Sequence, residues 1–323
     1  MLAATATSFN PTDPIAGLTV GDRPDPEPDE GWTVVRVKAT SLNHHDLWSL
    51  KGVGLREEQL PMILGTDAAG VDEDGNEVVI HAVIGDPVRG GGDETLDPKR
   101  SLLSEVHNGT LAELVAVPRR NLVAKPTGLS FEQASCLPTA WLTAYRMLVT
   151  RGALQKGETV LIQGAGGGVS TALIPIAKAM GLRVWVTSRD EAKRDHAVGL
   201  GADQAFEPGA RLPERVDAVM ESVGEATWSH SLKSLRPGGR IVVCGSTSGP
   251  NPPADLARVF FLQLSIIGST MGTHDELEQL MQLCNREGLV PLVDRTFSLR
   301  DARSALEYLN SGETFGKVVV TPA

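Results

Sequence analysis

The chain has 323 residues, which is more than a single hydrophobic core usually holds, so its length predicts two domains. Hydrophobic residues make up 41% and charged residues 22% of the chain, a globular composition that excludes a disordered protein. Lysine and arginine number 30 against 40 acidic residues. The resulting formal net charge of −10 argues against a nucleic-acid partner.

Cysteine usage and hydropathy predict the compartment. Cys136, Cys244 and Cys284 lie far apart without metal-ligand spacing, and such an odd, sparse set is not a disulfide framework. No apolar run approaches the ~20 residues that span a bilayer, and residues 1–10 lack the pattern of a secretory signal. We therefore expect a cytoplasmic protein without a membrane partner.

The N-terminal part of the chain is predicted to be β-rich. A proline- and acid-rich turn at residues 23–30 precedes a β-branched strand at 33–38, and further strands are expected at 78–83 and 111–117. Residues 90–97 are polar and unpatterned, which predicts a mobile surface loop.

Strands and helices alternate after Pro126, which predicts a parallel sheet with crossover helices. A turn at 236–239 precedes one of these strands, and Pro175 is expected to kink its helix because it removes a backbone hydrogen bond. Apolar residues at 131–148 have helical spacing, and we predict helices at 171–180 and 275–286. The predicted strands are 159–163, 183–188, 217–221, 240–244, 265–270 and 317–321.

A glycine-rich turn joins the strand at 159–163 to the helix that follows. Glycines permit a tight turn and let the backbone approach a pyrophosphate, which binds at the helix N-terminus. Ser170 takes the place of the third glycine of the usual fingerprint and is small enough to keep helix and strand close. Strand, glycines, helix and second strand together predict a dinucleotide site. Its expected residues in the turn are Gly164, Gly167, Gly168 and Val169.

The end of the second strand indicates which dinucleotide binds. NAD sites usually place an acidic residue there, whereas this chain continues with Ser188, Arg189 and, one turn later, Lys193. A hydroxyl and two cations suit the 2′-phosphate of NADP(H), which a carboxylate would repel. Two alternatives remain open: the cations are solvated and paired with Asp190 and Glu191, or one of these acids reaches the ribose.

Several motifs occur in order along the chain. They are residues 42–48 (LNHHDLW), 64–70 (LGTDAAG), 109–113 (GTLAE), 142–145 (LTAY), the glycine turn, 235–240 (LRPGGR) and 315–319 (FGKVV). Together the chain resembles the medium-chain dehydrogenase/reductase superfamily over essentially its whole length. Within the superfamily it resembles the zinc-lacking quinone oxidoreductase (zeta-crystallin-like) branch, for which the motifs are less specific.

The resemblance implies an α/β protein of two domains. A Rossmann doubly wound parallel sheet would span residues 125–272, and a β-rich GroES-like catalytic domain would combine residues 1–124 and 273–323. The active site would lie in the cleft between them. A homodimer or homotetramer is implied as well, often joined through the strand that matches residues 265–270.

Zinc-dependent members of the superfamily hold a catalytic metal with Cys, His and Cys, and the matching positions here are Asn43, Thr66 and Thr139. None is a thiolate or an imidazole, and residues 82–104, which match the structural-zinc lobe, contain no cysteine. We therefore expect no metal. The remaining potential ligands are His44, His45, Asp67 and Cys136. Adjacent histidines at a strand end point to opposite sides, so both would not reach one ion.

The resemblance also implies the residues of the site. The expected catalytic residues are Asn43, His45, Asp46, Trp48 and Thr139. Beyond the glycine turn and the second strand, the expected cofactor contacts are Thr143, Gly245, Ser246 and Lys317.

His45 is the first candidate for the proton donor. It occupies the position of a proton-relaying hydroxyl in zinc-dependent relatives, and its ordinary pKa of about 6.5 suits the role. The alternative is a histidine that only hydrogen-bonds to backbone, with protons drawn from water. Trp48 and Trp141 are equally suited to core packing or to an aromatic wall for a planar substrate.

A site without a Lewis acid favours a substrate that delocalises the charge of the incoming hydride. We expect an NADPH-dependent oxidoreductase that reduces a quinone or a similar conjugated carbonyl, with a small molecule as its substrate. The alternatives are an enone or enoyl double-bond reductase, a zinc-type alcohol dehydrogenase and a non-catalytic NADPH-binding protein. Fold by itself does not separate these functions.

Overall fold

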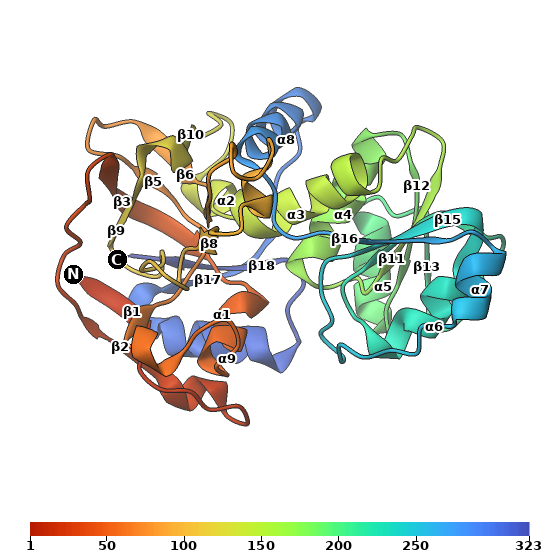
Figure 1. The fold of residues 1–323 in the computed structure, drawn as a ribbon, viewed down its shortest axis with the longest axis horizontal. Coiled ribbons are helices and arrows are strands. Elements are labelled where there is room, and N and C mark those ends of the chain that lie inside the picture. Colours follow the sequence, from red (N-terminus) through yellow and green to blue (C-terminus); the bar gives the residue numbers. More distant parts are fainter. Residues whose placement is uncertain (323) are drawn as a thin grey trace. The chain divides into compact units, whose positions relative to one another are not determined.

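The computed structural model describes residues 1–322 and contains two compact units (Figure 1). Unit 1 comprises Met1–Leu142 and the segment that begins at Met271, and unit 2 is Thr143–Thr270. Within the part of the chain that the structure describes, no helix is long and apolar enough to cross a membrane.

Unit 1 is built on a seven-stranded sheet. Its strands are β3 (Trp32–Ser41), β5 (Ala69–Val71), β6 (Glu77–Ile80), β9 (Leu114–Pro118), β10 (Leu122–Ala124), β17 (Val293–Ser298) and β18 (Lys317–Thr321). They run in the order β10-β6-β5-β3-β18-β17, and β9 also pairs with β3. β18, the last strand of the chain, thus pairs antiparallel with β3, which carries the alternating buried and exposed side chains of a half-buried strand.

Smaller strand groups and four helices complete unit 1. The strands are β1 (Leu2–Ala6), β2 (Leu18–Asp22), β4 (Met62–Ile63), β7 (Val83–Ile84) and β8 (Ser101–Leu102). The helices are α1 (His44–Leu50), α2 (Phe131–Ala134), α8 (His274–Glu287) and α9 (Ala302–Ser311), and a π-helical turn spans Leu137–Trp141.

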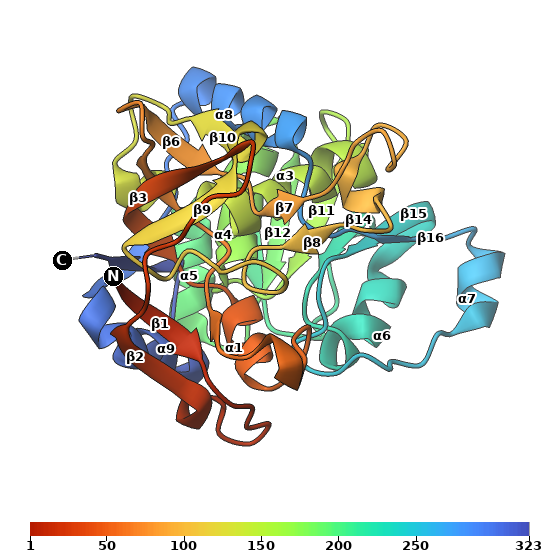
Figure 2. The ribbon, with the colours of Figure 1, turned by 60° about the vertical axis from the view of Figure 1, so that its left-hand side comes forward.

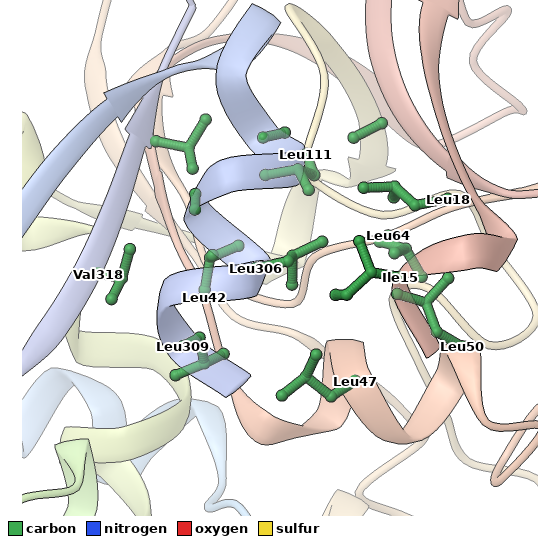
Figure 3. Close-up of a cluster of buried hydrophobic side chains, with 14 of the residues drawn as sticks. Ile15, Leu18, Leu42, Leu47, Leu50, Leu64, Leu111, Leu306, Leu309 and Val318 are labelled. Carbon is green, nitrogen blue, oxygen red and sulfur yellow. The ribbon is translucent and has the colours of Figure 1, made fainter. Parts of the chain in front are cut away.

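The main core of unit 1 forms where α9 lies against α1 and the sheet. α9 buries Ala302, Ala305, Leu306 and Leu309, the i, i+3, i+4, i+7 spacing of one helix face. These side chains pack with leucines of α1 and with Val318 of β18 (Figure 3). The apolar side chains of α1 and of α9, which lie far apart in the sequence, therefore hold α1 in its place in unit 1.

Unit 2 is a six-stranded parallel sheet in the order β13-β12-β11-β14-β15-β16. The strands are β11 (Thr159–Gln163), β12 (Arg183–Thr187), β13 (Gln204–Phe206), β14 (Val216–Glu221), β15 (Leu235–Val243) and β16 (Ser265–Gly268). The helices are α3 (Leu142–Arg146), α4 (Gly168–Ala179), α5 (Glu191–Gly199), α6 (Glu225–Ser234) and α7 (Leu256–Phe261), with a π-helical turn at Met147–Arg151. The strand order reverses between β11 and β14, and ligands bind at such a reversal beyond the carboxyl ends of the strands.

Some predicted elements are confirmed and others are corrected. β11 and β18 begin and end where the sequence predicts them. The turn expected at 236–239 instead lies inside β15, because Gly238 at φ +73° and a register shift against β14 let the strand continue. α4 begins three residues earlier than expected and continues through Pro175.

The polar segment at residues 90–97, for which the sequence predicts a mobile loop, ends in Asp97, a residue with several hydrogen bonds. The buried carboxylate of Asp97 accepts hydrogen bonds from Arg89 Nε and Nη2 at 3.1 and 2.7 Å. It also accepts the backbone N–H groups of Asp86 and Lys99 at 2.8 and 2.9 Å. One charged side chain therefore organises the segment, which a pattern of polar residues does not reveal.

Candidate functional site

The glycine turn of unit 2 leaves the N-terminus of α4 open. Gly164 follows β11 with a φ of +82°, a conformation that favours glycine. Gly167 is the N-cap of α4 and no side chain caps the helix, so its first N–H groups are available to a phosphate. A Cβ atom on Gly167 would meet no atom within 4 Å, which shows that the space beside the turn is open.

A buried polar network supports the turn from behind. Thr187 donates to Gln163 Oε1 at 2.6 Å and accepts the backbone N–H of Gly164 at 3.3 Å. Gln163 Nε2 donates to Ser231 at 3.0 Å, and Ser231 donates to Glu221 at 2.6 Å. The network joins the carboxyl ends of three strands. Sequence reasoning missed Gln163 and Glu221, although polar residues that end buried strands are a detectable signal.

The end of β12 gathers positive charge. The carboxylate of Asp190 accepts the backbone N–H of Lys193 and caps α5, which engages this acid in the helix. Arg189 is exposed and forms no ion pair among residues 1–322. Arg194, which sequence reasoning did not select, donates to the backbone oxygen of Ser188 at 2.7 Å. The pairing of Arg189 with Asp190 is therefore not observed.

The other expected cofactor residues of unit 2 come from three elements, the loop after β15 and the helices α4 and α3. Gly245 and Ser246 follow β15 and pack against the loop after β14: a Cβ atom on Gly224 would lie 3.1 Å from Ser246. Val169 lies in the first turn of α4, directly after the glycine turn. Thr143 is buried at the start of unit 2, on α3. Their contacts with a cofactor stay a prediction.

In unit 1, Asn43, Thr66 and Thr139 lie together although they are 23 and 73 residues apart in the sequence. Asn43 Nδ2 donates to Thr66 Oγ1 at 3.1 Å, and the hydroxyls of Thr66 and Thr139 lie 3.0 Å apart. Asn43 precedes α1, and Thr139 lies in the π-helical turn. Thr139 is partly exposed, whereas Asn43 and Thr66 are buried.

A buried ion pair adjoins this cluster. The ammonium of Lys317 donates to Asn43 Oδ1 at 2.6 Å, to the backbone oxygen of Leu42 at 2.7 Å and to Asp67 Oδ2 at 3.3 Å. Asp67 Oδ2 also accepts Ser41 Oγ at 2.7 Å and Asn43 Nδ2 at 2.9 Å. Lys317 is 3% exposed and its three N–H bonds are used, so a direct contact with the cofactor is not supported.

Asp46 and Trp48, the remaining expected catalytic residues of α1, have different surroundings. Asp46 is fully buried, and its carboxylate accepts the backbone N–H groups of Asn43 and Gly65 at 2.8 and 3.0 Å. Burial raises the pKa of Asp46, and these backbone bonds make it a positioning residue. Trp48 is partly exposed, while Trp141 is 1% exposed and packs in the core.

His45 lies on the first turn of α1, so the expected strand end for the two histidines is wrong. Its Nε2 lies 3.1 Å from Glu105 Oε1, and its Nδ1 lies 3.5 Å from Ser104 Oγ. Burial lowers the pKa of His45, but the hydrogen bond to Glu105 and the charges of Asp46 and Asp67 outweigh it, and the net pKa is raised. The ring, 23% exposed, thus favours the protonated form and has a carboxylate partner rather than backbone.

Comparison with known proteins identifies the family. Residues 29–127 match the "Alcohol dehydrogenase GroES-like domain" and residues 168–286 match the "Zinc-binding dehydrogenase" family. An acryloyl-coenzyme A reductase of Sulfurisphaera tokodaii is 30% identical over 328 residues, which cover 96% of this chain and 98% of the relative. The chain belongs to the medium-chain dehydrogenase/reductase superfamily. The expected α/β fold class, with a GroES-like domain and a Rossmann sheet, is confirmed.

Solved members of the superfamily share the fold over the whole chain. An NAD-dependent alcohol dehydrogenase has a TM-score of 0.91 at 34% identity, with 100% of both chains covered. A 2-octenoyl-CoA carboxylase reductase, solved with NADP and 2-octenoyl-CoA, has a TM-score of 0.91 at 25% identity and covers 99% of this chain and 87% of its own. These relatives do not support the quinone oxidoreductase branch that the motifs resemble.

A superfamily zinc does not fit the residues of this chain. Asn43, Thr66 and Thr139 offer an amide and two hydroxyls, not the thiolates, imidazoles or carboxylates that bind zinc tightly. The ammonium of Lys317, 2.6 Å from Asn43 Oδ1, would also repel a cation. Among the described residues one group of potential ligands lies elsewhere, on the first turn of α8, with its carboxylates exposed: His274, Asp275 and Glu278. Such exposed groups are common without a metal.

Proposed function

We propose that the protein reduces the carbon–carbon double bond of an α,β-unsaturated acyl thioester, such as an enoyl-CoA, with NADPH. The observation that carries the proposal is the hydrogen-bonded cluster of Asn43, Thr66 and Thr139 at the matching metal-ligand positions. Zinc-dependent alcohol oxidation uses a metal that acidifies the alcohol, whereas conjugate reduction places charge on a thioester oxygen that hydrogen bonds stabilise.

The relatives favour a thioester over the quinone that we expected from the sequence. The Sulfurisphaera relative is named for acryloyl-coenzyme A, and the octenoyl-CoA reductase was solved with its acyl-CoA. Two crotonyl-CoA reductases of Streptomyces, each 28% identical to this chain, are also named for an enoyl-CoA. The quinone has no comparable support, so the double-bond reductase, our alternative from the sequence, becomes the main proposal.

The reaction adds one hydride and one proton to the substrate. When bound, NADPH would supply the hydride for the β-carbon and would leave as NADP⁺. The electron pair of the double bond passes to the thioester oxygen as an enolate, and the α-carbon then takes a proton. We assign that proton to the imidazolium of His45, whose charge the Glu105 carboxylate stabilises.

The residues of unit 2 fit NADP(H). The open N-terminus of α4 would hold the pyrophosphate, and the buried network of Gln163 and Thr187 would keep the turn in place. Arg189 forms no ion pair with the residues that the structure describes, and Asp190 caps α5. The end of β12 would therefore present a cation rather than a carboxylate to the adenosine ribose. This charge arrangement supports NADPH over NADH.

We further propose a homodimer formed through β16. Among the described strands β16 pairs only with β15, so its other edge carries unpaired backbone groups. Four apolar side chains on β16 and on the preceding helix α7 are exposed: Ile266, Leu256, Phe260 and Phe261. Figure 2 shows α7 at the margin of unit 2. An edge strand beside an apolar patch is self-complementary in a twofold dimer, so a second copy is the occupant it fits.

Steady-state assays test the proposed reaction. Purified protein with NADPH should reduce crotonyl-CoA to butyryl-CoA, oxidise cofactor in a 1:1 ratio to product, and keep its activity after treatment with a chelator. Benzoquinone with NADPH and a primary alcohol with NADP⁺ are assayed separately as alternative substrates. Turnover of the quinone alone would contradict the proposal, and so would tight NADPH binding without turnover of any acceptor.

A further inference from the structure

We propose that Thr139 donates the hydrogen bond that stabilises the thioester oxygen, and that a chain of buried contacts fixes the direction of this bond. The chain runs from Lys317 and Asp67 through Asn43 and Thr66 to the Thr139 hydroxyl. The inference rests on the proposed function, because it names the group that binds the oxygen on which charge develops.

The ion pair sets the orientation of the Asn43 amide. Lys317 can only donate hydrogen bonds and an ionised Asp67 can only accept them. Asn43 Oδ1 faces the ammonium at 2.6 Å, and Nδ2 faces the carboxylate oxygen at 2.9 Å. The opposite orientation would set an N–H group against an ammonium and an oxygen against a carboxylate. All three groups are buried, so both mismatches would be costly.

The orientation of Asn43 then fixes the hydroxyl of Thr66. Nδ2 donates to Thr66 Oγ1 at 3.1 Å, so Thr66 receives a hydrogen bond and still has its own proton to place. Thr66 is 1% exposed, and among residues 1–322 the remaining partner of its hydroxyl is Thr139 Oγ1 at 3.0 Å. Thr66 therefore donates to Thr139. The reverse direction would leave a buried hydroxyl proton without an acceptor.

The proton of Thr139 is left for a ligand. Thr139 accepts from Thr66 and is partly exposed, and its hydroxyl has no acceptor within the described chain. It lies in the π-helical turn Leu137–Trp141, a wide turn that is frequent at functional sites. The chain of bonds thus ends in one oriented donor at an accessible position.

An oriented neutral donor suits conjugate reduction. Hydride addition moves charge onto the thioester oxygen, and a donor that is already oriented stabilises this charge without reorganisation. Accepting a hydrogen bond from Thr66 also strengthens the donor capacity of Thr139 by cooperativity. The interaction is stronger in the transition state than in the bound substrate, so its loss should lower kcat more than it raises KM.

Isosteric substitutions test each link. Thr139→Val removes the terminal donor. Thr66→Val removes the hydroxyl that donates to Thr139, which is one hydrogen bond further from the substrate. Thr139→Ser and Thr66→Ser retain the hydroxyls. Thr5→Val is the matched control, because Thr5 is a buried threonine of the same unit whose hydroxyl has no hydrogen-bond partner among residues 1–322. Circular dichroism and thermal unfolding confirm folding, and kcat and KM are measured with crotonyl-CoA and NADPH.

We expect kcat of Thr139→Val to fall on the order of 100-fold, with little change in KM, as for other oxyanion donors. Thr66→Val should lower kcat about tenfold, the worth of one hydrogen bond. Both serine variants should recover most of the activity, and Thr5→Val should match the parent. A folded Thr139→Val enzyme with unchanged kcat, or a Thr66→Val enzyme equal to the parent, overturns this inference alone. A parent protein inactive on every enoyl-CoA overturns the proposed function, and the inference falls with it.

Discussion

The pairing of His45 with Glu105 shows how a single residue's chemistry depends on its neighbours. Burial removes water from the ring of His45, which disfavours the imidazolium and lowers its pKa. The carboxylate of Glu105 at 3.1 Å and the buried Asp46 and Asp67 reverse this preference, so the net pKa of His45 is raised above its ordinary value of 6.5. The raised pKa extends the pH range over which His45 can donate its proton.

Glu105→Gln should shift the pH dependence of the reaction. A general acid works when protonated, so kcat falls as the pH rises through the pKa of His45. Removing the Glu105 charge lowers that pKa, and the decline should move to lower pH. His45→Gln should lower kcat at least about 100-fold at neutral pH. The measurement is kcat against pH, with Glu57→Gln as an exposed control. Superimposable profiles for Glu105→Gln and the parent would remove Glu105 from the mechanism.

Arg189→Gln should weaken the binding of NADP⁺ about tenfold or more, which is the worth of a hydrogen bond to a charged group. The affinity for NAD⁺, which has no 2′-phosphate, should stay nearly unchanged. Calorimetric titration of both nucleotides measures the two affinities without turnover. Lys156→Gln is the control, an exposed cation that precedes β11 and so lies at the opposite end of the parallel strands. Equal losses for both nucleotides would contradict a phosphate contact.

At the scale of elements, Asp97 joins the two ends of the segment at residues 86–99 through hydrogen bonds. These ends, Asp86 and Lys99, donate backbone N–H groups to the same carboxylate that binds Arg89 in a bidentate pair. The hydrogen bond from Arg89 first, and then that from Lys99, hold the pKa of Asp97 well below its usual range. A group with a lowered pKa stabilises the fold above its unfolded pKa and loses this effect as the pH falls through the folded pKa.

Asp97→Asn should loosen this segment selectively. The amide cannot accept the bidentate guanidinium and the two backbone N–H groups together, so hydrogen exchange over residues 86–99 should become faster. Exchange in unit 2 should not change. Mass spectrometry of the peptides resolves the two regions, and Asp29→Asn, an exposed aspartate of the same unit, is the control. Unchanged protection at residues 86–99 would show that other contacts order the segment.

At the scale of the whole molecule, the exposed edge of β16 and the apolar face of α7 predict association. Phe260 and Phe261 are 72% and 78% exposed, although phenylalanine side chains are usually buried in monomeric proteins. Ile266 on the edge strand is 46% exposed. A covered edge strand also removes the risk of uncontrolled pairing that an open strand carries. Both observations concern unit 2 alone.

Substitution of both phenylalanines by serine, Phe260→Ser with Phe261→Ser, should convert the dimer into a monomer. Loss of two large apolar side chains from one interface weakens association by several orders of magnitude, since each contributes on the order of 2 kcal/mol. Light scattering after size-exclusion chromatography measures the mass. Val88→Ser, an 86% exposed apolar residue of unit 1, should leave the mass unchanged. A parent protein that is monomeric at all concentrations would contradict the proposed dimer.

The sequence predicted local features well where a single segment contains the whole signal. The continuous apolar strand β11 and the glycines after it specify a dinucleotide turn, and the alternation of strands and helices specifies the parallel sheet. Prediction from the sequence failed where the signal is shared between residues far apart in the chain or depends on their contacts. Asp97 orders its segment through an ion pair with Arg89. The residues of the predicted turn at Gly238 belong to β15 because this strand pairs with β14.

The alternation of strands and helices and the glycine turn follow from the sequence by itself, because periodicity and backbone freedom are properties of residues. The resemblance to the superfamily placed Asn43, Thr66 and Thr139 at the metal-ligand positions, and ligand chemistry then made them poor zinc donors. Only the tertiary structure decided that these three residues form a hydrogen-bonded chain with Lys317, and that Glu105 faces His45. Hydrogen-bond direction and pKa depend on distances between segments far apart in the chain, and those distances are set by packing.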